Sequence, residues 1–204
     1  RTVVIAIFAV IIGVILGILI ALIRNYHEET DKGKFLNKLA ESYVTIIRGT
    51  PAVLQLMIIY YIIFRTVDIN PVLVGIIAFG INSGAYVSEI IRSGINSIDK
   101  GQKEAASSLG LTYRETMKSI ILPQAIRNVL PALGNEFITL LKETSVAGYI
   151  GIVDLVKAAD IIASGTYNYF FPLIIIAIIY LILTIGLSKL LTVFEKKVLD
   201  HARG

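Results

Sequence analysis

The chain has 204 residues, of which 55% are hydrophobic, with a mean hydropathy of +0.77 and a formal net charge of +4. It contains no cysteine, which excludes disulfides, iron–sulfur clusters and thiolate nucleophiles, and its two histidines, His27 and His201, lie too far apart in sequence to favour a histidine metal site. The basic residues cluster between apolar runs without interleaved aromatics, which argues against nucleic-acid binding.

The apolar runs indicate an all-α protein that crosses a membrane several times. Residues 2–23 and 161–188 carry no charged side chain, and about 20 apolar residues allow a helix to cross the hydrocarbon core. The first run is too long for a signal peptide, so we expect a true span, with a short further segment before Arg1. Five spans are predicted within a single domain, 1–204, at about 2–23, 49–64, 69–92, 128–148 and 169–191.

The distribution of basic residues favours five spans over four. A count of four would make 128–148 a soluble helix, since charged residues interrupt it. The segments 24–48, 92–127 and 189–203 hold five, six and four of the 19 Lys and Arg residues, and an even number of spans would put them on conflicting sides. The positive-inside rule makes their common side cytoplasmic. We therefore expect a multi-pass protein of the inner or plasma membrane, with the N-terminus outside and the C-terminus cytoplasmic.

The residues between the first two spans predict an amphipathic helix. Residues 24–47 mix acidic and basic side chains with an apolar stripe formed by Phe35, Leu36, Leu39 and Tyr43. This pattern is typical of a helix at the membrane interface, and we assign it a scaffolding role. Gly49-Thr50-Pro51 is expected to cap and kink the next span. Gln55, just over one turn into that span, is expected to face a pathway that the spans enclose.

The segment of about 96–126 predicts two short helices joined at a glycine. Asp99 is the expected N-cap of the first helix, and Gly110 ends it as a C′ residue. Thr112 is the expected N-cap of the second, with Glu115 at capping-box spacing. Pro123 is expected to end that second helix.

The same segment carries the pattern EAA-x3-G-x9-I-x-LP, formed by Glu104-Ala105-Ala106, Gly110, Ile120, Leu122 and Pro123. In this it resembles the EAA loop of permease subunits of ATP-binding-cassette (ABC) importers. Residues 47–51 with Gln55 resemble the IRGTP…Q segment of the polar-amino-acid subfamily, and residues 86–95 resemble its third helix. The resemblance covers nearly the whole chain.

This resemblance implies the permease fold of type I importers and a set of partners. It implies a homodimer, or a heterodimer with a close homologue, paired with two copies of an ATPase subunit. It also implies an extracytoplasmic amino-acid-binding protein that delivers an amino-acid substrate. The sequence has no G-x-x-x-x-G-K-[ST] stretch. ATP and Mg are therefore expected in the partner ATPase, with no cofactor in this chain.

Small side chains in the EAA segment suit docking into a groove of a partner protein. We assign ATPase coupling to five residues: Glu104, Ala105, Ala106, Ser107 and Gly110. The alternative is a surface hairpin without a partner, in which Glu104 only favours the start of its helix.

Polar residues inside the third predicted span are candidates for substrate binding. Asn82, Tyr86 and Glu89 step along one face of the expected helix, and an intramembrane carboxylate costs about 2.5–3.5 kcal/mol on insertion scales. Arg92 is placed to pair with Glu89 three residues away, or to mark the membrane interface by snorkelling.

A second polar stripe follows the fourth predicted span. It consists of Asn135 or Glu136, then Thr139, then Lys142 and Glu143. Of these we assign substrate binding to Asn135, Thr139 and Glu143, with Glu143 as the preferred ligand and Thr139 as its hydrogen-bonding partner. The alternative is a Lys142–Glu143 arrangement that only faces a neighbouring helix.

The excess of carboxylates over cationic side chains in these two spans favours a cationic amino acid such as arginine, lysine or histidine. The outer loop, from Gly148 to about Asn168, adds Asp160 as a further candidate in the path. The alternative there is a solvated helix face, formed by Asp154, Lys157 and Asp160.

Two other functional classes compete with an ABC importer subunit that works by alternating access. A secondary transporter or channel would favour an internal repeat and a denser row of ionisable residues in the spans. A membrane enzyme would need a nucleophile and a base, and the sequence offers no His pair, no cysteine and no Ser/His/Asp set. We therefore predict a transport subunit that is not itself an enzyme.

Overall fold

The computed structural model describes residues 1–201, with side chains as far as residue 197; Arg203, counted above in the basic tail, lies outside them. The described part of the chain is helical and contains no strand, which confirms the all-α prediction. The helices are α1 (Thr2–Thr30), α2 (Lys34–Arg48), α3 (Ala52–Ile58), α4 (Pro71–Asn96), α5 (Lys100–Ser108), α6 (Tyr113–Thr116), α7 (Leu122–Glu143), α8 (Leu155–Thr166) and α9 (Phe170–His201). Wider π-helical turns follow α3 and α6, at Ile59–Ile63 and Met117–Ile121, and a 3-10 turn, Thr144–Ile150, follows α7.

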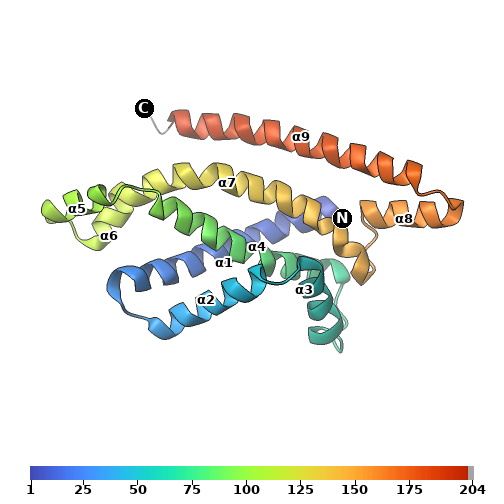
Figure 1. Cartoon of the computed structure of the whole chain (residues 1–204), viewed down its shortest axis with the longest axis horizontal. Coiled ribbons are helices and arrows are strands. Elements are labelled where there is room, and N and C mark those ends of the chain that lie inside the picture. The colour runs from blue at the N-terminus through green and yellow to red at the C-terminus, as the bar shows by residue number, and fades with distance from the viewer. Residues whose placement is uncertain (202–204) are drawn as a thin grey trace.

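Two parallel helices, α1 and α4, form the centre of the fold (Figure 1). They run in the same direction, because the residue numbers of their contacts increase together along both helices: Gly13 lies against Ser83, and Gly17 lies against Val87. Both helices carry a small-xxx-small pattern at this contact, with Gly13 and Gly17 on α1 and Gly80 and Gly84 on α4. Small residues let two membrane helices approach closely.

Because α1 and α4 run in the same direction, the chain between them must return across the bundle. The helix α2 packs against both α1 and α4, and α3 continues at an angle of 108° to α2. The bend falls at Gly49-Thr50-Pro51, as the sequence predicted. The side-chain amide of Gln55 donates to the Ile47 carbonyl at 2.7 Å, which satisfies a carbonyl at the end of α2.

The prediction of one amphipathic helix over 24–47 is wrong in its bounds, because two helices share these residues. The first helix continues to Thr30, so residues 24–30 belong to α1. The side of α2 that packs on the bundle consists of Asn37, Ala40 and Val44. Most of the predicted apolar stripe therefore faces away from the bundle: Phe35, Leu36 and Leu39 are exposed, and of its four members only Tyr43 reaches α4, where its hydroxyl donates to the Ile81 carbonyl.

Pro123 does not end the helix before it, which corrects the sequence prediction. The helical path runs from α6 through the π turn into α7, and the amide of Leu122 donates to the carbonyl of Met117, five residues back. Pro123 then lies in the first turn of α7. Proline is tolerated there because the first amides of a new helical segment need no partner within it.

The helix α7 runs antiparallel to α4. Asn128 donates to the Ser97 hydroxyl at 2.8 Å, and Gly94 lies against Val129. The last helix, α9, packs mainly against α7 and α8 and exposes most of the apolar surface of its described residues (Figure 1). Exposed Leu and Ile side chains on a long helix are typical of contact with lipid or with another membrane helix.

Three helices among the described residues are long and apolar enough to cross a membrane: Thr2–Thr30, Pro71–Asn96 and Phe170–Lys197. The bent pair formed by Lys34–Arg48 and Ala52–Ile63 would make a fourth. The helix α7 is not in this set, and it carries Arg127, Glu136, Lys142 and Glu143. The count of five therefore stays a prediction, which the alternating directions of α1, α2–α3, α4, α7 and α9 support.

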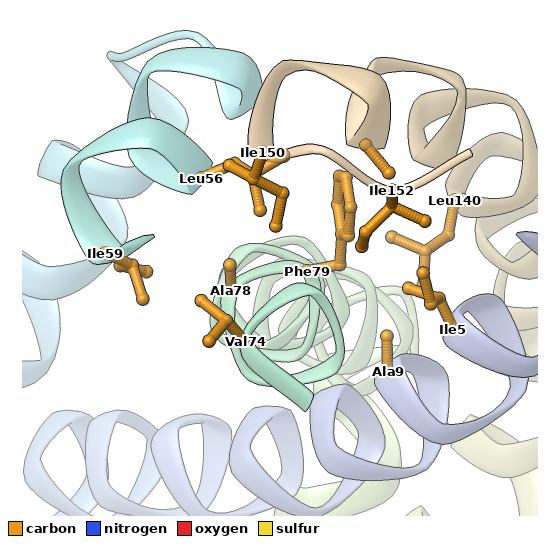
Figure 2. Packing of buried hydrophobic residues seen from close by; sticks show 11 residues of the cluster. Ile5, Ala9, Leu56, Ile59, Val74, Ala78, Phe79, Leu140, Ile150 and Ile152 are labelled. Atoms are coloured by element: carbon orange, nitrogen blue, oxygen red, sulfur yellow. The ribbon is translucent and has the colours of Figure 1, made fainter. Parts of the chain in front are cut away.

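The apolar core lies at the end of the bundle where α8 is found (Figure 2). Phe79 of α4 is buried there in one cluster with Ile5 of α1 and Leu140 of α7, and Ile150 and Ile152 join the cluster from the connection to α8. This packing fixes α1, α4 and α7 relative to one another at that end. A second, smaller apolar cluster, formed by Ile95, Ile98, Ile121 and Ala125, lies at the other end of α4.

Candidate functional site: a polar path along α4 and α7

A buried amide pair lies near the middle of α4. Asn82 donates its side-chain amide to Gln55 Oε1 at 2.9 Å, and Gln55 in turn donates to the backbone and hydroxyl oxygens of Thr50 at 3.0 and 2.7 Å. Both amide side chains are buried, at 3% and 8% exposure. Asn82 Oδ1 has no hydrogen-bond partner among the described residues. The structure thus brings two predicted site residues together, and one acceptor of the pair is left unused.

The next residue of α4 connects this amide pair to α7. Ser83, fully buried, donates to Glu136 Oε1 at 2.9 Å. Glu136 is close enough to Glu143, two turns further along α7, for the two carboxylates to interact electrostatically. Of the two residues that the sequence left open, the structure therefore places Glu136 against α4. Asn135 lies on the exposed side of α7.

Thr139 and Glu143 share the side of α7 that Glu136 occupies. Both are partly buried, whereas Lys142 is exposed. No ion pair between Lys142 and Glu143 occurs in the described part of the chain. The two carboxylates, Glu136 and Glu143, thus form an acidic site with a hydroxyl donor, Ser83, and within the described residues neither forms an ion pair, although Lys142 is near enough to Glu143 to interact with it electrostatically.

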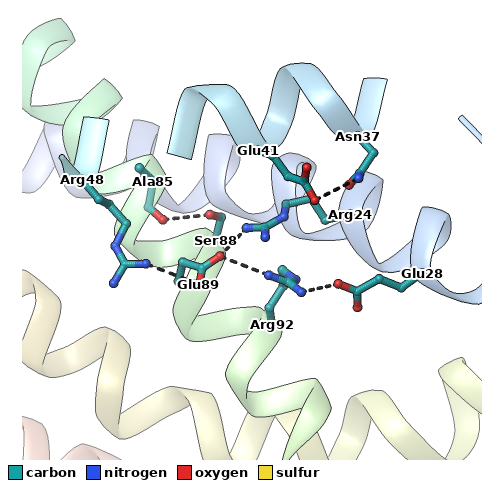
Figure 3. Close-up of polar contacts among 9 residues, drawn as sticks. All are labelled: Arg24, Glu28, Asn37, Glu41, Arg48, Ala85, Ser88, Glu89 and Arg92. Atoms are coloured by element: carbon teal, nitrogen blue, oxygen red, sulfur yellow. Dashed lines mark hydrogen bonds and ion pairs between the residues drawn. The ribbon is translucent and has the colours of Figure 1, made fainter. Parts of the chain in front are cut away.

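A cluster of arginines surrounds Glu89 near the end of the bundle that carries α5 and α6 (Figure 3). Glu89 forms ion pairs with Arg24 of α1, with Arg48 of α2 at 3.4 Å and with Arg92 at 3.3 Å. Arg92 also pairs with Glu28 of α1. The predicted Glu89–Arg92 pair is present, but it is one part of a five-residue network from three helices, so the charge of Glu89 is already matched.

An open groove of about 470 Å³ lies beside this cluster, between α4, α7 and the end of α2. Glu89 and Tyr86 line it, and the Arg48 guanidinium lies over the Tyr86 ring at 5.4 Å from its centroid. The other polar members are Ser93, Ser97 and Asn128. Two of the predicted site residues, Tyr86 and Glu89, thus face one groove, while Asn82 lies deeper in the bundle.

Asp160 lies at the opposite end, in a pocket of about 430 Å³ between α8, α9 and the preceding turn. Its carboxylate accepts a hydrogen bond from Lys157 at 2.8 Å, and this contact raises the pKa of Lys157. Asp154 does not share a solvated face with them. It is 5% exposed and caps α8 by accepting from the amide of Lys157, and burial raises the pKa of its carboxyl.

The two helices α5 and α6 lie at the far end of the bundle and carry the local features that the sequence predicts (Figure 1). Asp99 accepts from the amide of Gly101 at 2.7 Å, and Gly110 has a φ of +80° after α5. Thr112 and Glu115 form the predicted capping box, and the hydrogen bonds from Thr112 lower the pKa of Glu115.

The exposed side of α5 differs from the predicted docking surface at one position. Glu104, Ala105 and Ser107 are exposed, and Leu109, which follows α5, is 81% exposed. Ala106 is 1% exposed, so it packs inside the hairpin and is not part of an exposed face with Ala105.

Sequence reasoning missed the residues that surround Glu89. Arg24 and Glu28 come from the segment that was predicted to be a scaffold, and Arg48 comes from the IRGTP-like stretch, for which only a resemblance was noted. They lie 65, 61 and 41 positions before Glu89, so no spacing rule for one helix connects them. The signals available were the basic end of an apolar run at Arg24 and the place of Arg48 in that stretch.

Similarity to known proteins identifies the family of this chain. Residues 4–200 match the family described as binding-protein-dependent transport system inner membrane component. The chain belongs to this family. A putative glutamine transport system permease protein of Rickettsia bellii is 44% identical over 196 residues, which cover 95% of this chain and 88% of the relative. An arginine transport system permease protein of Bacillus subtilis is 43% identical, with coverage of 95% and 87%.

Solved structures show the same fold. A crystal structure of an amino acid ABC transporter with histidines is 47% identical, with a TM-score of 0.86 and coverage of 96% of this chain and 90% of that one. The MetNI methionine ABC transporter has a TM-score of 0.74 at 17% identity, and this likeness concerns the fold alone. The ABC permease resemblance is thereby confirmed, and this member of the family is a multi-pass membrane subunit of a transporter.

Proposed function

We propose that this chain forms the translocation path of an importer for polar amino acids, preferentially cationic ones, and that α5 and α6 couple it to a separate ATPase. The observation that carries this proposal is the position of the EAA segment. It forms a hairpin at one end of the bundle, with Glu104, Ala105 and Leu109 exposed. A helix that exposes small side chains beyond the membrane helices suits the groove of a partner protein.

The names of the relatives support an amino acid as the substrate. One relative is a putative glutamine permease, another is an arginine permease, and the similar crystal structure contains an amino acid ABC transporter with histidines. These substrates share an ammonium and a carboxylate group and differ in the charge of the side chain. Residues that recognise side-chain charge therefore decide between them.

The acidic site on α7 supports a cationic preference. Glu136 and Glu143 are partly buried and form no ion pair among the described residues, and Lys142 acts on Glu143 only through its charge at longer range. Glu89, in contrast, already has three arginines around it. We therefore assign the recognition of a positive side chain to Glu143, with Thr139 as hydrogen-bonding partner and Glu136 beside them. Asn82 and Gln55 would bind polar groups of the substrate one layer deeper, through the unused acceptor of Asn82. The exposed Asn135 is placed to meet a second permease copy.

The three polar regions follow one another along the bundle and support a path by alternating access. Asp160 lies in the pocket at the α8 end, Glu143 and Asn82 lie further in, and Tyr86, Glu89 and Arg92 lie towards the α5 end. The α5 end carries most of the basic residues, so we assign it to the cytoplasm, with the N-terminus outside. Delivery by a binding protein would then occur at the α8 end.

Complete transport is expected to need partners: two copies of the ATPase subunit, a second permease that is identical or closely homologous, and an extracytoplasmic binding protein. In this arrangement ATP and Mg bind to the ATPase. The exposed residues Glu104, Ala105, Ser107 and Leu109 would contact it, while Ala106 and Gly110 would maintain the shape of the hairpin.

The test is reconstitution in liposomes with the cognate ATPase, followed by ATP-dependent uptake of labelled arginine, histidine and glutamine. We expect arginine and histidine to compete with each other. The variant Glu143→Gln should lower arginine uptake about tenfold, which corresponds to about 1.4 kcal/mol, and leave glutamine uptake unchanged. Asp68→Asn is the matched control, because Asp68 is an exposed acid away from the path.

Each other outcome has a defined meaning. Preference for glutamine in the unmodified protein would refute the cationic preference and leave the importer function intact. Unchanged arginine uptake by Glu143→Gln would remove Glu143 from the binding site. Uptake without ATP would refute coupling to an ATPase and favour a secondary transporter or a channel.

A further inference from the structure

The last two turns of α1, residues 24–30, extend past the centre of the bundle and reach the end where α5 and α6 lie (Figure 1). The sequence predicts these residues to be part of an interfacial scaffold. In the structure they form one unbroken helix with the membrane-spanning part of α1. We refer to residues 24–30 as the α1 strut.

Polar side chains of the α1 strut contact three different elements at that end. Glu28 pairs with Arg92 of α4, and Glu29 pairs with Lys103 of α5. Asn25 donates to the Tyr113 hydroxyl of α6 at 2.7 Å. These contacts join residues 64, 74 and 88 positions apart. One short helical segment thus holds α4, α5 and α6 together.

The other connections of α5 to the bundle are an amide pair, in which Gln102 of α5 donates to Gln124 of α7 at 3.2 Å, and two short corners. Three residues, 97–99, join it to α4, and Gly110 lies in the corner to α6. The only residue of α5 that is buried is Ala106. A cavity of about 200 Å³, lined by Glu29, Lys103 and Tyr113 among others, lies between the strut and the hairpin. The strut and α5 therefore meet through side chains.

The α1 strut continues directly into the close contact between α1 and α4. Gly13 and Gly17 lie so near α4 that an added Cβ at Gly17 would come within 2.5 Å of Val87. Packed interiors resist deformation and transmit displacement. A force on Lys103 therefore has a stiff route into α1 and α4, in parallel with the Gln102–Gln124 contact, which leads into α7.

We propose that the α1 strut transmits movement of α5 and α6 to the membrane helices, with Glu29 and Lys103 as positioning residues of this coupling. The inference rests on the proposed function, because it needs an ATPase that acts on α5. It adds a route within this chain: the ATPase moves α5, the Glu29–Lys103 pair and the Asn25–Tyr113 bond carry the movement to α1, and α1 moves together with α4.

The first experiment separates coupling from folding. Glu29→Ala and Lys103→Ala are reconstituted with the ATPase, and the ratio of amino acids transported to ATP hydrolysed is measured. We expect this ratio to fall about fivefold, the lower end of typical coupling between sites, while basal ATP hydrolysis is retained. The double variant that carries both Glu29→Lys and Lys103→Glu should restore the ratio of transport to ATP hydrolysis. Lys100→Ala is the matched control, since Lys100 also lies on α5 and makes no ion pair among the described residues.

The second experiment uses the absence of cysteine from the chain. The pair Glu29→Cys and Lys103→Cys is joined by a short bifunctional thiol reagent. Before cross-linking, the cysteine pair lacks the ion pair and should lose coupling as the alanine variants do. If the strut and α5 move as one body, the cross-link should restore the transport rate to at least about half that of the unmodified protein. A transport rate that stays low or falls further on cross-linking would show that α5 must move relative to α1, and this would overturn the proposal.

Failure of the proposal and failure of the proposed function give different results. An unmodified protein that shows no ATP-dependent uptake refutes the function, whatever the variants do. An unmodified protein that transports normally, together with Glu29→Ala and Lys103→Ala variants of unchanged coupling ratio, refutes the strut alone. A swap that fails to restore coupling would also refute it, because a pair that acts by charge should work in either direction.

Discussion

The contact between α1 and α4 gives the sharpest prediction for stability, at Gly17. An added Cβ at this position would lie 2.5 Å from Val87 Cγ1 and 3.0 Å from the amide nitrogen of Ser88. Ordinary van der Waals contact begins at 3.4 Å, so the helices must separate by about 0.9 Å in Gly17→Ala. The Ser88 amide is backbone and cannot turn aside, and Val87 is β-branched and stiff.

Two opposing effects determine the size of the change. Overpacking of this kind costs about 1–3 kcal/mol. Replacing glycine by alanine inside a helix returns about 0.8–1.0 kcal/mol of helix propensity. We therefore expect Gly17→Ala to lower the free energy of unfolding by up to about 2 kcal/mol. At about 2–4 °C per kcal/mol for a chain of this size, the Tm should fall by up to about 8 °C.

The assay is thermal unfolding of the purified protein in detergent, with Gly186→Ala as the matched control. Gly186 lies inside α9 with no neighbouring atom within 4 Å of an added Cβ, so this variant gains helix propensity without a clash. Its Tm should stay equal or rise slightly. Adding Val87→Ala to Gly17→Ala should recover part of the loss, and a double-mutant cycle measures the coupling between the two positions. Equal Tm values for Gly17→Ala and Gly186→Ala, or a cycle without coupling, would refute the close approach of the two helices.

Two further predictions concern the hairpin. Gly110 has a φ of +80°, a conformation that costs a residue with a side chain about 1–2 kcal/mol. Gly110→Ala should therefore speed hydrogen exchange at residues 105–112, whereas Gly165→Ala, at an open position, should not. Equal exchange in both variants would contradict the left-handed corner. Hydrogen bonds from Thr112 lower the pKa of Glu115 from its ordinary 4.5, so the capping box stabilises the hairpin above pH 4.5 and loses this contribution as the pH falls through the lowered value. An NMR titration should give Glu115 a midpoint below 4.5 that moves upwards in Thr112→Val, and an unchanged midpoint would exclude the capping box as the cause.

The sequence predicted features that depend on a few neighbouring residues. The cap at Asp99, the glycine corner at Gly110 and the Thr112–Glu115 box are all present, because each is set by hydrogen bonds within about four positions along the chain. The bend at Gly49-Thr50-Pro51 belongs to the same class. Pro123 is the exception: proline ends a regular α-helix, but the π turn before it changes the hydrogen-bonding register and lets the helical path continue.

Assignment of the site residues to faces of their helices was less successful. Sequence periodicity left Asn135 and Glu136 as alternatives, and the structure turns Glu136 towards Ser83. A rotation of about 100° separates neighbouring residues of a helix, so the choice depends on how α7 packs against α4. The same holds for α2, which buries Ala40 and Val44 and leaves Phe35 exposed.

By itself the sequence determined that the chain is helical, where its apolar runs begin and end, and that its EAA segment forms a capped hairpin. These properties follow from uncharged length and from local hydrogen bonding. Only the tertiary structure decided that Glu89 meets Arg24 and Arg48, and that Glu29 of α1 meets Lys103 of α5. Such contacts join residues more than 40 positions apart. They depend on the parallel packing of α1 and α4 through small residues, which sets the depth and rotation of both helices.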